Sequence, residues 1–231
     1  IDLTLGADFF NDEIESAQGR AEVVVGGPIS ATPPSPPTRP LGKKTYTLDP
    51  DSHTFLTHHT LNDVPVLPAA MVLEWMSQAA TEAYAHLHLH AIKDLSVLRG
   101  VQVPKVRTVD LTWSQNLDDT VGTTLNLELR DPTVSGPMSL LYKARAELRA
   151  TPLAPVSPPS EVTNSRPYPH DVDTAYRNLL FHGPAFRGIQ QISGQTLDGI
   201  TGAIQSSKPA ALAVNSDRWH TDPVAVDSLL Q

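Results

Sequence analysis

The chain has 231 residues, of which 40% are hydrophobic and 18% charged, and a formal net charge of −8. This composition is typical of a globular protein with one sizeable core or two small ones, and the acidic excess argues against binding to nucleic acid or to an anionic membrane. The absence of cysteine, of a long apolar run and of a signal-peptide pattern excludes disulfides and cysteine nucleophiles, and favours a cytoplasmic setting without a membrane span.

The first part of the chain is predicted to be the end of another domain. Residues 7–16 have the pattern of a short amphipathic helix, and residues 21–25 that of a buried strand. We therefore interpret residues 1–27 as a C-terminal remnant of a preceding domain. Residues 28–42 are rich in proline and are interpreted as a linker.

Residues 43–150 are predicted to form one helix and an antiparallel sheet. Apolar residues recur at helical spacing after Pro68, which predicts a helix over 68–84. Alternating apolar and polar residues over 123–130 are typical of a half-buried strand. The strands expected here are 45–48, 95–103, 109–115, 123–130 and 138–148.

A second proline-rich linker is predicted over residues 151–170, and the same order of elements then begins again. Residues 171–231 carry the patterns of a helix at 172–181, strands at 186–193 and 199–205, and a helix that starts at Pro223. A helix packed on one antiparallel sheet is an α+β arrangement. Its repetition predicts a double hotdog in which the second hotdog is incomplete.

Three ordered motifs give this pattern a family resemblance. The segment HTLNDVPVLP, residues 59–68, resembles the HxxxGxxxxP motif of dehydratase domains in modular polyketide synthases and polyunsaturated fatty acid synthases. The segment LFHGPAF, residues 180–186, resembles their GYxYGPxF segment, and DPVAVDSLLQ, residues 222–231, resembles their HPALLDxxxQ segment. Residues 1–27 resemble the tail of a ketoreductase domain, and this order leans toward the fatty acid synthase branch.

The resemblance implies a reaction and a role for each motif residue. These domains remove water from a β-hydroxyacyl thioester carried on the phosphopantetheine of acyl carrier protein, and they need no other cofactor. His59 would take the α-proton and Asp227 would protonate the departing hydroxyl, with its carboxyl held by Gln231. Burial is expected to keep the Asp227 carboxyl protonated, and the helix N-terminus at Pro68 would polarise the thioester carbonyl.

The resemblance further implies which residues line the substrate site and which partners the chain has. The expected lining residues are Val66, Leu67, Gly183, Pro184 and Phe186. The expected partners are acyl carrier protein and neighbouring synthase domains, and the resemblance allows a homodimer.

Two positions depart from the family pattern. Asp63 stands where the motif has glycine, and His182 stands where it has tyrosine. A carboxylate at 63 would crowd the thioester or repel enolate charge, which keeps a catalytically silent pseudo-dehydratase as an alternative. A product-template-like domain, which has a similar His and Asp pair, is a further alternative.

The remaining histidines receive structural interpretations. His58 is taken as a neighbour of the catalytic position. His86, His88 and His90 alternate with leucine and are interpreted as a helix end that passes into a solvated turn, because no carboxylate or cysteine completes a metal site. No metal is therefore predicted.

Overall fold

The computed structural model describes residues 38–116, 123–154, 165–197 and 199–231. The chain divides into two units, residues 1–36 and 37–231, and all the described residues belong to the second. The predicted domain remnant at 1–27 lies outside the described residues. In the part that the structure describes, no helix is long and apolar enough to cross a membrane.

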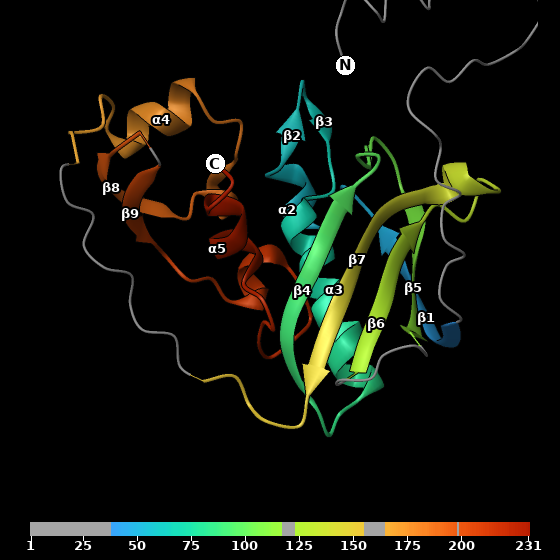
Figure 1. Ribbon diagram of the computed structural model, residues 1–231. Helices are drawn as coiled ribbons and strands as arrows, with labels where there is room; N and C mark the ends of the chain where they lie inside the picture. The colour runs from blue at the N-terminus through green and yellow to red at the C-terminus, as the bar shows by residue number, and fades with distance from the viewer. Residues whose placement is uncertain (1–37, 117–122, 155–164, 198) are drawn as a thin grey trace, which may run out of the picture. The chain divides into compact units, whose positions relative to one another are not determined.

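A five-stranded antiparallel sheet forms the larger layer of this unit (Figure 1). Successive side chains along each strand point to opposite faces of the sheet. In the third strand in spatial order, Leu125, Leu127 and Leu129 therefore share one face, and they are fully buried. In spatial order the strands are β1 (Thr38–Leu48), β5 (Arg107–Asn116), β6 (Thr123–Arg130), β7 (Leu140–Arg149) and β4 (His88–Val97).

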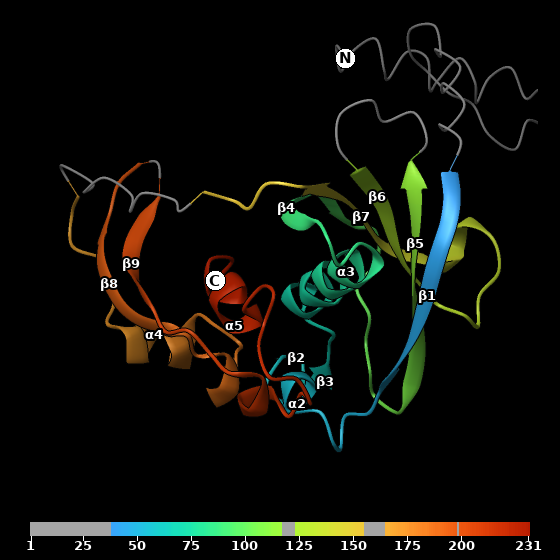
Figure 2. The same ribbon diagram turned by 90° about the horizontal axis from the view of Figure 1, so that it is seen from below.

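The central helix α3 (Ala69–Ala83) packs on one face of this sheet (Figure 2). Its apolar side joins the core through Met71, Trp75 and Met76. Trp75 also stacks on Tyr46 of β1, with ring centroids 4.0 Å apart. The predicted helix over 68–84 is confirmed, with Pro68 as its N-cap and Tyr84 as its C-cap.

Two sequence boundaries differ from the structure. Strand β1 begins at Thr38, inside the predicted linker 28–42, because its first residues pair with the end of β5. Near the end of the second predicted linker, 151–170, Arg166 exchanges two backbone hydrogen bonds with Gln195 and so extends the edge of the second sheet.

The strand predicted at 95–103 is placed wrongly. The structure has β4 over His88–Val97, followed by irregular chain from Leu98. His88 and His90 therefore lie in a strand rather than in a turn after a helix. Their alternation with leucine has the two-residue period of a strand. Strand β4 pairs with β7, with His88 opposite Arg149 at the start of the pairing.

The second half of the unit repeats the order in smaller form. Helix α5 packs against α3 on the side away from the five-stranded sheet, and the hairpin β8–β9 lies beyond α5 (Figure 2). The described part of the second hotdog thus has one two-stranded sheet and two short helices. Its elements are α4 (Val172–Asn178), β8 (Ile189–Gln195), β9 (Ile200–Ile204) and α5 (Pro223–Ser228).

Short elements precede α3 and interrupt the chain between the longer ones. Helix α2 (Thr54–Thr57) leads into the small hairpin of β2 (Thr60–Leu61) and β3 (Val64–Pro65). Short 3₁₀ helices follow at Pro137–Ser139, Pro184–Phe186 and Pro209–Leu212.

Candidate functional site

His59 is positioned by the small hairpin that follows it. The backbone N–H of Val66 donates to the carbonyl of His59, and the Nδ1 of His59 donates to the carbonyl of Val66, both over 2.9 Å. A carbonyl oxygen only accepts, so the ring proton of neutral His59 sits on Nδ1 and its Nε2 lone pair is free. The hairpin therefore fixes both the orientation and the tautomer of His59.

Asp63 occupies the turn of this hairpin. Asn62 and Asp63 have φ values of 50° and 62°, and strand residues pair directly on either side of them. Positive φ at both central residues is the geometry of a type I′ turn, which favours Asn, Asp and Gly. The motif position thus needs a residue that tolerates a left-handed backbone, and the side chain of Asp63 is exposed. The expectation that this side chain crowds the thioester stays a prediction.

Asp227 lies on α5, and Gln231 holds it there. Asp222 caps α5 by accepting from the N–H groups of Val224 and Ala225. The side-chain amide of Gln231 donates to Oδ2 of Asp227 over 2.9 Å and to the carbonyl of Phe186 over 3.0 Å. The contact predicted between Gln231 and Asp227 is present, although the helix itself ends at Ser228.

Tyr176 on α4 completes this support, and sequence reasoning missed it. Its hydroxyl donates to Oε1 of Gln231 over 2.9 Å and accepts from the N–H of Ile189 over 3.0 Å. The hydroxyl therefore links α4, β8 and the side chain that holds Asp227. No motif spacing in the sequence indicates this contact.

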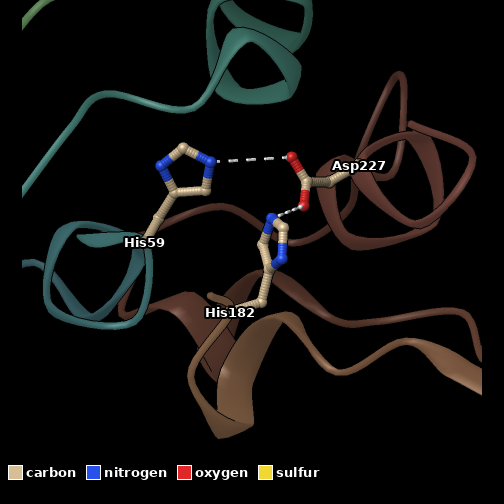
Figure 3. Close-up of side chains that lie close together, drawn as sticks. All are labelled: His59, His182 and Asp227. Carbon is tan, nitrogen blue, oxygen red and sulfur yellow. Dashed lines mark ion pairs between the residues drawn. The ribbon is translucent and has the colours of Figure 1, made fainter. Parts of the chain in front are cut away.

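His59, His182 and Asp227 meet between the two hotdogs (Figure 3). The Nε2 of His59 lies 3.9 Å from Oδ1 of Asp227, and the Nε2 of His182 lies 3.0 Å from Oδ2. All three residues are buried, with at most 8% of their surface exposed. The two imidazoles thus each lie beside a different oxygen of the Asp227 carboxylate, in a buried site.

His58 holds His182 in this position because it binds the residues that follow His182. The N–H of Gly183 donates to the carbonyl of His58 over 2.8 Å, and the N–H of Ala185 donates to its Nδ1 over 2.9 Å. A Cβ at position 183 would lie 2.9 Å from the backbone of His58, so only glycine allows this approach. His58 is therefore more than a neighbour, because it docks the 182–186 segment beside His59.

Burial lowers the pKa of His59 below its ordinary value, and the hydrogen bond to Val66 and the charge of Asp227 oppose this shift only in part. The imidazole is therefore neutral near pH 7 and is able to accept a proton at Nε2. This state is the one that a general base requires.

Burial raises the pKa of Asp227, but hydrogen bonds from His182 and Gln231 and the nearby histidine charges together bring it below the ordinary value. Burial thus acts in the expected direction, but the net shift of the pKa favours the carboxylate form. The 3.0 Å contact with His182 makes this carboxyl one member of a hydrogen-bonded pair instead of an isolated group.

Aromatic rings surround the two histidines. Phe181 stacks on His182 with centroids 4.0 Å apart and meets the edge of His59 at 5.0 Å. Phe186 is fully buried, with its centroid 5.7 Å from that of His59. Phe181 keeps 44% of its surface exposed, so it lies between the histidines and solvent.

The predicted lining residues fall into two groups. Phe186, Val66 and Gly183 lie at or beside the three side chains through the contacts described above. Leu67 is packed in the hydrophobic core, and Pro184 is exposed at the start of its 3₁₀ helix. Pro68 is buried and is the N-cap of α3. It makes no side-chain hydrogen bond there.

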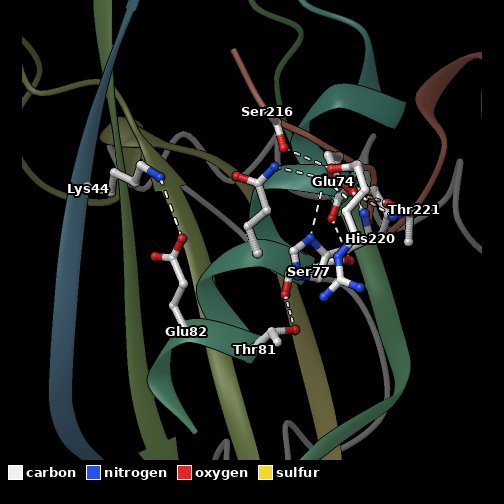
Figure 4. Close-up of polar contacts among 11 residues, drawn as sticks. Lys44, Glu74, Ser77, Thr81, Glu82, Ser216, His220 and Thr221 are labelled. Carbon is white, nitrogen blue, oxygen red and sulfur yellow. Dashed lines mark hydrogen bonds and ion pairs between the residues drawn. The ribbon is translucent and has the colours of Figure 1, made fainter. Parts of the chain in front are cut away.

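Glu74 of α3 ties the first hotdog to the loop before α5 (Figure 4). Its fully buried carboxylate accepts from the N–H groups of His220 and Thr221 and from the Thr221 hydroxyl, at 2.6 to 3.1 Å. Gln78 donates a further hydrogen bond to it over 2.8 Å. Because the loop leads directly into α5, Glu74 sets the position of the helix that carries Asp227.

An open, mostly apolar hollow of about 1050 Å³ lies in the second hotdog beside the site. Its walls come from α4, β8 and β9, and it includes Ser228 and Gln231 next to Asp227. Leu179, Ile200 and Leu229 on its walls are more than half exposed.

Comparisons with known proteins agree with the sequence motifs. Residues 43–130 match the family model of the polyketide synthase dehydratase domain. One of the polyunsaturated fatty acid synthase subunits of Thraustochytrium sp. is 24% identical over 203 residues, which are 84% of this chain and 7% of that protein. The chain thus spans a small part of the relative that it matches.

Solved structures show the same fold. The PpsC dehydratase domain from Mycobacterium tuberculosis superposes with a TM-score of 0.55 at 22% identity, covering 87% of this chain and 69% of that one. The dehydratase domain of the CurF module of the curacin polyketide synthase gives 0.60 at 17% identity, covering 81% and 68%. The resemblance to these dehydratase domains and the predicted α+β double hotdog are therefore confirmed.

Proposed function

We propose that this chain is a dehydratase that removes water from a β-hydroxyacyl thioester and releases the enoyl thioester. The observation that carries the proposal is the meeting of His59 and Asp227, from the two hotdogs, with 3.9 Å between imidazole and carboxylate. Each belongs to a motif that the resembled family uses for this reaction. The substrate is proposed to arrive on acyl carrier protein within a multidomain synthase, and the homodimer stays a prediction.

The two steps of the reaction divide between the three side chains. His59 takes the α-proton on Nε2, and the C–H electron pair becomes the new double bond as the C–O bond breaks. The His182–Asp227 pair, which has to carry one proton for this step, gives it to the departing hydroxyl, and water leaves. Return of the proton from His59 to the pair restores the starting state.

Burial of the site supports this chemistry. An α-proton beside a thioester is weakly acidic, so a neutral imidazole needs the developing enolate charge to be stabilised where water is excluded. A positioned acid or base contributes about 10²–10⁴-fold to the rate. The N-terminus of α3, which begins just after the hairpin that holds His59, supplies a partial positive charge in this region.

The test is to incubate the full chain with a β-hydroxyacyl pantetheine thioester and to follow the enoyl product by mass and ultraviolet absorbance. We expect an enoyl product that forms in proportion to the protein added. No enoyl product from a folded wild-type chain, with either the pantetheine or the carrier-bound substrate, would contradict the proposal.

Asp63→Gly separates this function from the catalytically silent alternative. Because Asp63 is exposed in a type I′ turn, glycine there is expected to change the dehydration rate by less than about twofold and the free energy of unfolding by less than about 1 kcal/mol. The measurement compares both quantities between wild type and variant. Activity that appears only in Asp63→Gly would show that the native chain is silent because of this carboxylate.

A further inference from the structure

Three metal-binding side chains converge in the site although the sequence predicts no metal. One ligand atom from each of His59, His182 and Asp227 lies within 4.8 Å of the other two. Among the described residues this is the one group of three such side chains with that spacing. The group unites residues from both hotdogs, which is why spacing along the sequence does not indicate it.

The distances are close to those of a metal site. Zinc binds imidazole nitrogen and carboxylate oxygen at about 2.0–2.2 Å, which places two ligand atoms of a tetrahedral site roughly 3.4 Å apart. The Nε2 of His182 lies 3.0 Å from Oδ2 of Asp227 and the Nε2 of His59 lies 3.9 Å from Oδ1, so these two distances, to different oxygens of the carboxylate, fall on either side of this value. Shifts on the order of 1 Å would bring the three atoms to bonding geometry.

The tautomer of His59 suits metal binding, and that of His182 has to change. The Nδ1 of His59 donates to the carbonyl of Val66, so its Nε2 presents a lone pair toward Asp227. A backbone carbonyl in this role is the usual outer partner of a metal-binding histidine. The Nε2 of His182 donates to Oδ2 of Asp227 over 3.0 Å in the described structure, so metal binding requires its proton to move to Nδ1, which is buried and has no hydrogen-bond partner there.

We propose that His59 Nε2, His182 Nε2 and a carboxylate oxygen of Asp227 form a reversible binding site for a divalent transition metal of the zinc type. Two imidazoles and one carboxylate are ligands that such ions prefer, and a fourth position stays open for water. The metal takes the place of the proton that the His182–Asp227 pair carries, so the bound ion inhibits dehydration. Only this inhibition rests on the proposed function; the metal binding stands without it.

His182 is what makes the site particular to this chain. The resembled dehydratases have tyrosine at its position, and the remaining His and Asp alone would offer only two ligands. His182 is only 6% exposed, and its contact with Asp227 places its Nε2 inside the site.

The test is a titration of the full chain with Co²⁺, followed by its visible absorption, and competition by Zn²⁺. The variants are His182→Phe and His59→Gln, with circular dichroism to select conditions in which each is folded. The matched control is His86→Gln combined with His88→Gln, which removes two exposed histidines outside the site. The dehydration rate is measured in parallel with and without Zn²⁺.

We expect a single Co²⁺ per chain in wild type and in the surface control, and affinity weakened by more than about 100-fold in both site variants. Equal affinity in wild type and both site variants, loss of binding in the surface control, or no binding in wild type would overturn the proposal. Metal binding without any effect on an active chain would overturn the inhibition. Metal binding by a chain without dehydratase activity would support the site and count against the proposed function.

Discussion

His59→Ala and Asp227→Asn are each expected to lower kcat for dehydration by about 10²–10⁴-fold, with the fold unchanged. Alanine at 59 removes the base, and asparagine at 227 keeps the shape of the side chain while removing the acid function of the His182 pair. Because the two residues act in one reaction, the double variant is expected to lose little more than the worse single variant. The measurement is the rate of enoyl thioester formation, with circular dichroism to confirm folding.

The matched control for this series is His88→Gln. His88 is an exposed histidine on β4, the edge strand of the first sheet, and it has no contact with the site. Its replacement is expected to leave the rate within about twofold of wild type, since exposed substitutions away from a site have small effects. A comparable loss in His88→Gln would mean that histidine loss acts through general destabilisation.

Glu74→Ala is expected to lower the free energy of unfolding by about 3 kcal/mol or more, the scale of breaking a buried charged network. The change leaves the N–H groups of His220 and Thr221 without their carboxylate acceptor. Because these residues lead into α5, the dehydration rate is expected to fall together with stability. Urea unfolding and the enoyl assay measure the two effects.

Glu82→Ala on the same helix is the control for Glu74. The carboxylate of Glu82 is largely exposed and lies 4.0 Å from the Lys44 ammonium (Figure 4). Exposed ion pairs contribute about 0–1 kcal/mol, so this variant is expected to unfold nearly as wild type does. Equal destabilisation by both substitutions would contradict the role assigned to Glu74.

The sequence motifs identify the residues at the centre of the site because the contacts within each motif form between residues close in the sequence. Residues 59–68 contain a histidine, a tight turn and a helix cap, and local backbone preferences are enough to bring Val66 back against His59. Gln231 follows Asp227 closely enough for a direct contact. The sequence patterns are therefore sufficient to predict the helix α3 and the strand β6, and the motifs are sufficient to select His59 and Asp227, which the structure places 3.9 Å apart.

The rest depended on contacts between distant segments. Nothing around Glu74 indicates that it accepts hydrogen bonds from residues 146 and 147 positions later. His182 was identified as a substitution, but its contact with Asp227, and hence the pKa direction of that carboxyl, appears only when the two hotdogs meet. The sequence predicts a turn at His88 and His90 because the end of the preceding helix pattern outweighs their strand period.

The claim that His59 and Asp227 form one dehydration site is tested most directly with a β-hydroxyacyl thioester that carries two deuterium atoms on the α-carbon. The mass spectrum of the product from wild type, His59→Ala and Asp227→Asn is the measurement. We predict that wild type forms an enoyl thioester that keeps one of the two deuterium atoms, while both variants leave the substrate unchanged. Enoyl product at the wild-type rate from either variant would contradict the assignment.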